Sequence, residues 1–168
     1  MQVKVSPSKV LKNYFGEISL LAYCLMSNHF HLLVRQNSER GIDNFMRSIS
    51  TKFVRYFNTR HKRIGPLFQG PYKAVKVDSE YQLVYLSKYI HRNPLDLSSY
   101  KDSPSRLNEY KYSSYGNYSH NFNQTWVIAK DILDLFSLKD KNISYLSFVE
   151  NGDPDDITLI APLTIDLE

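Results

Sequence analysis

Two histidines, His29 and His31, stand two residues apart in the segment MSNHFHLLVRQ (residues 26–36), whose other side chains are mostly apolar. Side chains alternate along a strand, so a strand would place both imidazoles on the same face. Two neutral imidazoles side by side can hold one divalent metal ion. The same spacing also occurs where one histidine is buried and the other is exposed, and two ligands leave a metal site incomplete. The pair predicts a metal site only if further ligands lie elsewhere in the chain.

A second group of side chains with suitable chemistry lies in the segment YLSKYIHRNP (residues 85–94). Tyr85, Tyr89 and Asn93 follow at steps of four, which places them on one stripe of a helix, whereas His91 lies off that stripe. The carboxamide oxygen of Asn93 could complete a metal site, and the phenol of Tyr89 could attack an electrophile that the metal polarises. Tyr85 is the second candidate nucleophile. Core packing also produces tyrosine stripes, and an asparagine before a proline is typical of a helix end.

Cations and aromatic side chains alternate in the segment RHKRIGPLFQGPYK (residues 60–73). Such cations can follow a phosphodiester backbone, and aromatic rings can stack on unpaired bases, although a flexible basic loop has the same composition. Residues 1–77 carry thirteen Lys or Arg against three Asp or Glu, whereas residues 78–168 carry eight against fourteen, so the basic face belongs to the first part. The residues predicted to contact a nucleic acid strand are Arg60, Lys62, Arg63, Phe68, Gln69, Tyr72 and Lys73, with Arg92 as a further phosphate contact.

The composition excludes several classes of protein. The 168 residues suffice for one domain with a core, and the single cysteine, Cys24, excludes an internal disulfide and a cysteine-rich zinc site. No apolar stretch approaches the roughly 18 residues of a membrane span, and the first residues lack the apolar centre of a secretory signal. We therefore expect a cytoplasmic protein that contacts no membrane.

The elements that must position these side chains predict an α+β fold. Apolar runs and turn residues predict strands over residues 17–26, 29–36 and 72–77, which would form one antiparallel sheet. Helical spacing predicts helices over residues 42–59 and 80–93, packed on that sheet. The second helix begins at a capping box on Ser79 and must end before Pro94.

The remainder of the chain is expected to be helical. A Ser- and Tyr-rich stretch over residues 97–124 is followed by predicted helices near 127–137 and 143–150, and by a mobile acidic tail from residue 151. We divide the chain into a domain over residues 1–120 and a helical extension with the acidic tail over residues 121–168.

Over residues 17–95 the sequence resembles the single-tyrosine HUH transposases, in particular the bacterial tyrosine transposases associated with repetitive extragenic palindromes. The resemblance rests on AYCLMSNHFHLLVRQ, RHKRIGPLFQGPYKAVKV and YLSKYIHRNPL, which occur in the family's order and spacing. The histidine–hydrophobic–histidine motif of the family matches His29, Phe30 and His31. The nucleophilic tyrosine matches Tyr89, and the polar third ligand four residues later matches Asn93.

The resemblance implies a fold, a reaction and a partner. The fold would be a ferredoxin-like antiparallel sheet covered by helices. The enzyme would bind single-stranded or hairpin DNA, as a possible homodimer, and would hold Mg²⁺ or Mn²⁺ on His29, His31 and Asn93. Tyr89 would attack the scissile phosphate to leave a 5′-phosphotyrosine and a free 3′-OH, which can later reverse the attack and rejoin DNA.

One departure from the family pattern leaves alternatives open. In the family, a strand and a full helix precede the segment that starts here at Glu17, for which the chain offers only MQVKVSPSKVLKNYF. We therefore expect the first strand of the sheet to be lacking. A catalytically silent DNA-binding remnant or regulator is the alternative to an active transposase. A hydrolase that uses metal-activated water is a third hypothesis, and a covalent DNA adduct would separate the three.

Overall fold

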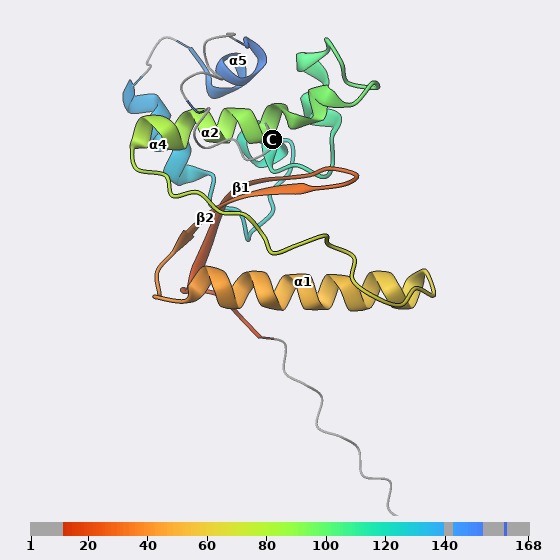
Figure 1. The fold of residues 1–168 in the computed structure, drawn as a ribbon. Helices are drawn as coiled ribbons and strands as arrows, with labels where there is room; N and C mark the ends of the chain where they lie inside the picture. Colours follow the sequence, from red (N-terminus) through yellow and green to blue (C-terminus); the bar gives the residue numbers. More distant parts are fainter. Residues whose placement is uncertain (1–11, 140–142, 153–159, 161–168) are drawn as a thin grey trace, which may run out of the picture. The chain divides into compact units, whose positions relative to one another are not determined.

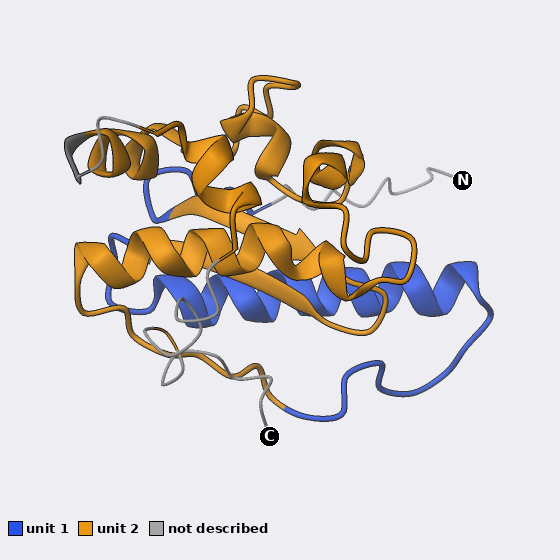
Figure 2. Ribbon diagram, turned by 90° about the horizontal axis from the view of Figure 1, so that it is seen from above, with its two compact units in different colours: residues 1–18, 36–70 blue, residues 19–35, 71–168 orange. Residues whose placement is uncertain are grey.

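The computed structural model describes residues 12–139, 143–152 and 160 (Figure 1). Contacts divide the chain into two compact units, one of residues 1–18 and 36–70 and the other of residues 19–35 and 71–168 (Figure 2). The second unit contains the predicted histidines and tyrosines. The fold is of the α+β class, with helices packed on an antiparallel sheet, as the sequence predicts.

The sheet is a hairpin of β1 (Ile18–Leu25) and β2 (Phe30–Gln36), which confirms the strands predicted over residues 17–26 and 29–36. Ser27 and Asn28 form its turn, and the Met26 N–H donates to the His29 carbonyl at 2.9 Å. The apolar run of β1 is explained by its burial, because residues 21–24 are all buried.

Helix α2 (Glu80–Arg92) packs on this hairpin and confirms the helix predicted over residues 80–93. It begins where the sequence indicates, because the Ser79 Oγ accepts a hydrogen bond from the Gln82 N–H at 3.1 Å. Pro94 ends the α-helix, and the chain continues as a short 3-10 helix, η1 (Asn93–Asp96). Val84 and Ile90 of α2 join the hydrophobic core that also contains Leu33 of β2.

The prediction of a third strand over residues 72–77 is wrong. Residues 71–78 form no regular element, and the sheet has two strands within the described part of the chain. The edge of β1 that β2 leaves open is occupied by later segments instead. The Leu25 N–H donates to the Tyr112 carbonyl and the Ile128 N–H to the Leu20 carbonyl, each at 2.8 Å. Alternation of apolar and polar residues makes a strand only where the segment pairs with the edge of a sheet, and residues 71–78 pair with neither strand of the described sheet.

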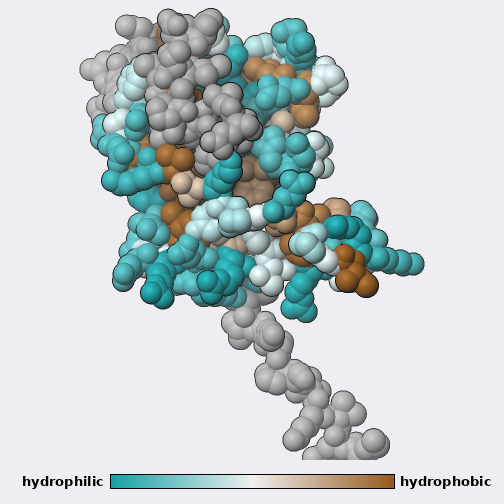
Figure 3. Space-filling model, viewed as in Figure 1, coloured by the Kyte–Doolittle hydropathy of each residue, from teal (hydrophilic) through white to brown (hydrophobic). Residues whose placement is uncertain are grey.

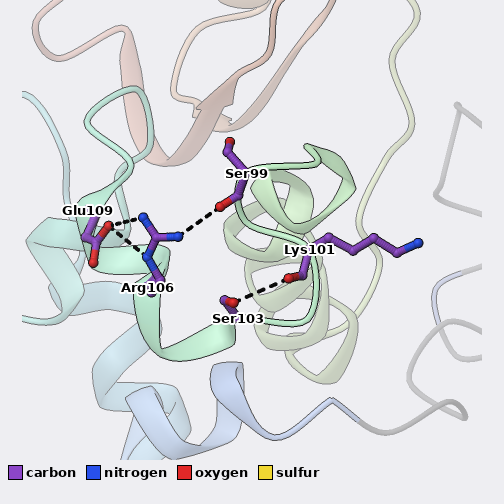
Figure 4. A network of polar contacts seen from close by, with 5 residues as sticks. All are labelled: Ser99, Lys101, Ser103, Arg106 and Glu109. Carbon is purple, nitrogen blue, oxygen red and sulfur yellow. Dashed lines mark hydrogen bonds and ion pairs between the residues drawn. The ribbon is translucent and has the colours of Figure 1, made fainter.

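The elements after residue 96 complete the second unit. They are η2 (Pro104–Glu109), α3 (Tyr115–Tyr118), α4 (Lys130–Lys139) and α5 (Tyr145–Glu150), of which α4 and α5 confirm the predicted helices and start two to three residues later than expected. Arg106 donates to the Glu109 carboxylate and to the Ser99 carbonyl and so joins η2 to the turn before it (Figure 4). Helix α2 lies between the hairpin and α5 (Figure 1). Most of the acidic tail lies outside the described residues.

The first unit contains α1 (Gly41–Arg60), which confirms the helix predicted over residues 42–59. At one end of α1, the Tyr14 hydroxyl donates to the Asn44 carbonyl at 2.7 Å. At the other end, the ring centroid of Phe57 lies 4.3 Å from that of His61, and the ring centroid of Phe53 lies 6.2 Å from that of Phe68. The loop after α1 is therefore held by ring contacts.

The described surface carries apolar side chains among polar ones, and part of this apolar surface is visible as brown patches in Figure 3. Among the described residues, no helix has both the length and the hydropathy needed to cross a membrane.

Candidate active site

The hairpin and α2 bring the two histidines and one tyrosine together. The ring centroids of His29 and His31 are 4.9 Å apart, with the rings nearly perpendicular. The ring of Tyr89 lies edge-to-face with that of His31 at a centroid distance of 5.7 Å. All three side chains are half-buried, so they are held by packing and still reach the surface. The predicted histidine pair and the predicted nucleophile are thus neighbours.

The hydrogen bonding of His29 engages one of its two ring nitrogens and leaves the other as a candidate metal ligand. Its Nδ1 lies 2.8 Å from the Asn28 Oδ1. A carboxamide oxygen only accepts hydrogen bonds, so Nδ1 carries the proton and Nε2 keeps its lone pair. The turn residue before the motif therefore selects the tautomer that a metal ligand needs.

Asn93 is buried at the end of α2, one turn after Tyr89. Its Nδ2 donates to the Tyr89 carbonyl at 3.1 Å, which places the carboxamide at the C-terminus of the helix. The oxygen Oδ1 is the atom that could serve as a metal ligand. The described residues contain no group of three or more His, Cys, Asp or Glu side chains placed to hold a metal ion.

Tyr85, the second candidate nucleophile, has different neighbours. Its ring packs on that of Tyr81 at 4.3 Å and edge-on against that of Phe148 at 5.2 Å. Tyr85 therefore connects α2 to α5, whereas Tyr89 contacts the histidine pair.

His91 is a buried residue for which the sequence predicted no role. Its Nδ1 lies 2.9 Å from the Tyr145 hydroxyl and its Nε2 lies 2.8 Å from the Ser114 Oγ. The Ser87 Oγ donates to the Val84 carbonyl at 2.6 Å and so accepts from the Tyr145 hydroxyl at 2.8 Å. Tyr145 then accepts from the Nδ1–H of His91. Burial lowers the pKa of His91 to about 3, so the imidazole is neutral at pH 7 and its Nε2 accepts a hydrogen bond from the Ser114 hydroxyl.

The predicted nucleic-acid contacts fall in both units. Arg60, Lys62, Arg63, Phe68 and Gln69 belong to the first unit, and Tyr72, Lys73 and Arg92 to the second. In the first unit, the guanidinium of Arg63 donates to the Asn58 Oδ1 and to the Pro66 carbonyl, each at 3.4 Å, and so helps to shape the loop. A shallow pocket lined by Arg55, Tyr56, Thr59 and Arg60 lies on α1, and of these residues only Arg60 was predicted.

Arg92 is engaged within the chain. Its Nη1 donates to the Val149 carbonyl at 2.5 Å and to the Glu150 carbonyl at 3.1 Å. The phosphate contact predicted for Arg92 stays a prediction, since this guanidinium also has a structural use.

The α+β unit, the histidine pair and the apposed tyrosine define the class of site expected for a transposase with one tyrosine and an HUH motif. A comparison with protein-family models supports this class, because the model described as "Transposase IS200 like" matches residues 3–93, more than half of the chain. The chain therefore belongs to the IS200-like transposase family, whose function is DNA transposition. Comparisons with curated proteins and with solved structures gave no significant match.

Proposed function

We propose that the protein cuts and rejoins single-stranded DNA, at or beside a hairpin, through a covalent bond to Tyr89. The edge-to-face contact between Tyr89 and His31 carries this proposal. In this contact the Tyr89 ring lies next to one of the two imidazoles that would hold the metal ion. The Tyr89 side chain is half-buried, so a flexible DNA strand can reach its phenol.

The donor atoms at this site suit a divalent ion. Nε2 of His29, the imidazole of His31 and Oδ1 of Asn93 would hold Mg²⁺ or Mn²⁺, and two nitrogen donors favour Mn²⁺ over the oxygen-preferring Mg²⁺. The bound ion would supply Lewis-acid stabilisation of the charge that develops on a phosphate oxygen.

The reaction consists of two exchanges of phosphate esters. The Tyr89 phenol oxygen forms a bond to phosphorus and loses its proton to solvent, while the bond to the 3′-oxygen breaks and that oxygen leaves with the electron pair and takes up a proton. DNA then carries its 5′-phosphate on Tyr89. In the second step a 3′-OH attacks this phosphotyrosine and releases the phenol, so no external energy source is consumed.

Substitution of Tyr89 by phenylalanine tests the proposal. Tyr89→Phe removes one oxygen and keeps the ring, so strand cleavage and covalent adduct should both be lost while affinity for single-stranded DNA is kept. The assay is gel separation of a 3′-labelled oligonucleotide after denaturation, with Mn²⁺ present, since that label stays on the 5′-phosphorylated fragment.

Tyr85→Phe is the matched control, because Tyr85 contacts Tyr81 and Phe148 instead of the histidines. It should keep the adduct. An adduct on Tyr89→Phe would contradict the proposed nucleophile, cleavage without any adduct would support a hydrolase, and DNA binding without cleavage by the wild-type chain would support a regulator.

A further inference from the structure

Helix α5 lies outside residues 3–93, the range that matches the transposase family, yet it makes direct contacts along the helix that carries Tyr89. Its first residue, Tyr145, is buried, and the hydroxyl lies 2.8 Å from the Ser87 Oγ and 2.9 Å from the His91 Nδ1. Ser87 and His91 are one helical turn apart. The N-terminal end of α5 therefore binds two successive turns of α2.

The C-terminal end of α5 is bound by two cations of the same helix. The Lys88 Nζ donates to the Asn151 carbonyl at 2.9 Å, and the Arg92 Nη1 donates to the carbonyls of Val149 and Glu150. The last carbonyls of a helix carry partial negative charge and lack partners within the helix, so cations are favoured there. A side chain at Gly152 would clash with Arg92, because an added Cβ would lie 2.3 Å from its Nη2.

Lys88 is almost fully enclosed in this contact. It is only 4% exposed, and its Nζ also lies 4.2 Å from the ring centroid of Phe148. A lysine in such surroundings has few alternative positions. Its contact with α5 therefore restrains α2 at the residue next to Tyr89.

The two pairs of contacts restrain rotation of α2 about its own axis. Residues 87 and 91 form one stripe, and residues 88 and 92 form the next stripe, about 100° further around the helix. Tyr89 lies a further step of about 100° around, on the side that contacts His31. A rotation that moved Tyr89 away from His31 would break contacts at both ends of α5.

We propose that α5 and the residues after it, up to Gly152, are a positioning element for the nucleophile, with Tyr145 and Lys88 as positioning residues that keep Tyr89 directed at His31. The inference rests on the proposed function, in which Tyr89 is the nucleophile. It assigns the orientation of the Tyr89 ring to a segment outside residues 3–93, the range that matches the family. A six-residue helix is too short to persist alone, so α5 and α2 order one another.

The test compares two variants that each lose a tyrosine hydroxyl. Tyr145→Phe removes the hydroxyl shared by Ser87 and His91, whereas Tyr23→Phe removes one that donates to the Gln124 Oε1 at 2.9 Å. The first readout is the NMR chemical shift of the His31 imidazole protons in the protein without DNA. The Tyr89 ring shifts these protons, and a Tyr89→Leu variant supplies the value without that ring.

Tyr145→Phe should move the His31 signals toward their values in Tyr89→Leu, and Tyr23→Phe should leave them at the wild-type values. Single-turnover cleavage by Tyr145→Phe should fall by about ten- to a hundred-fold with affinity for single-stranded DNA kept, since misplacing a reacting group by a small distance costs this much. A segment that only stabilises the fold would leave the His31 signals of the folded protein unchanged.

Lys88→Met serves as a second variant, because methionine keeps the aliphatic stem and removes the donor to Asn151. It should move the His31 signals in the same direction as Tyr145→Phe. Wild-type His31 signals in both variants would overturn the inference. If the wild-type chain does not cut DNA, the proposed function fails, and the NMR comparison still decides whether α5 positions Tyr89.

Discussion

The residues in and around the candidate site differ in how firmly neighbouring groups fix their side chains. His29 has its proton placed by Asn28, and Tyr89 has its ring placed by His31. His91, two residues after Tyr89, is fully enclosed and bonded on both nitrogens. The half-buried side chains are therefore suited to react, and the fully enclosed one is suited to hold the helix.

Removal of either proposed metal ligand of the hairpin should abolish cleavage without unfolding the protein. His29→Ala and His31→Ala truncate half-buried side chains of the hairpin, so we expect no detectable strand cleavage and a near-wild-type circular dichroism spectrum. EDTA should have the same effect on the intact protein, and added Mn²⁺ should restore cleavage.

His120→Asn is the control for this experiment, because His120 is exposed and has a positive φ of 59°, which asparagine tolerates. It should cleave DNA like the wild type. Full cleavage in EDTA would remove the metal from the mechanism.

Burial of neutral His91 should make stability depend on pH. Burial lowers the pKa of His91 from its ordinary value of 6.5 to about 3. The neutral form is favoured in the folded state, so its contribution is complete above pH 6.5 and is lost as the pH falls toward 3. The groups that face the imidazole are the hydroxyls of Tyr145 and Ser114 and the rings of Tyr115 and Tyr118. The limiting slope is about 1.4 kcal/mol per pH unit.

Urea unfolding at pH 7, 6, 5 and 4 measures this dependence. His91→Gln removes the titrating group, so below pH 6 its free energy of unfolding should fall less steeply than that of the wild type, while the carboxylates contribute equally to both. Parallel curves would show that protonation of His91 does not limit stability in acid.

At the scale of elements, local patterns predicted more than pairings between distant segments. The Ser79 cap and Pro94 are signals carried by neighbours in sequence, and they bound α2 correctly. The alternation around Val75 predicted a strand, but the edge of β1 is taken by residues 112–114 and 127–128, roughly ninety or more positions further along than their partners. No local pattern reports such a competition.

The same contrast between local patterns and contacts of distant segments applies to the candidate site. The two-residue spacing of His29 and His31, and the stripe of Tyr89 and Asn93, are local and were predicted, and the family resemblance placed them together. The contacts of α2 with Tyr145 and Val149 join residues more than fifty positions apart, so they were not predicted. His91 stood out in the sequence only as a histidine off the stripe.

The cap of α2 should contribute measurably to stability. Ser79→Ala removes the oxygen that accepts from the Gln82 N–H, so the free energy of unfolding should fall by about 1 kcal/mol. Urea denaturation followed by circular dichroism gives the value.

Ser99→Ala is the matched control, because only the backbone carbonyl of Ser99 has a described hydrogen bond, which it accepts from Arg106 (Figure 4). Its effect should stay within about 0.5 kcal/mol of zero. Equal losses in both variants would contradict a specific role for the cap.

At the scale of the whole molecule, charge is distributed unequally along the chain. Residues 1–77 are strongly basic and residues 78–168 are acidic. The contacts with single-stranded DNA that are predicted in the first unit lie in and after the last turn of α1. This distribution would attract a polyanion to the first unit.

Affinity for single-stranded DNA should therefore fall steeply with salt. Each phosphate contact that is lost should reduce the slope of log affinity against log salt by about 0.7. Lys62→Gln should show this change in fluorescence anisotropy titrations with a short labelled oligonucleotide. Lys111→Gln, an exposed lysine of the acidic half, should keep the wild-type slope. A slope that Lys62→Gln leaves unchanged would assign Lys62 to the solvated surface.

The pairing of β1 with residues far along the chain has a consequence for how the protein is made. The Tyr23 N–H bonds to the Ser114 Oγ, 91 positions later, and α2 is bound by Tyr145 and the residues that follow it. Contacts of such long range slow folding, and here their partners leave the ribosome last. The histidine pair and the nucleophile are therefore synthesised well before the segments that hold them. The growing chain would therefore carry these side chains in an unassembled state, and the proposed DNA cutting would begin only after synthesis has passed the segment around residue 152.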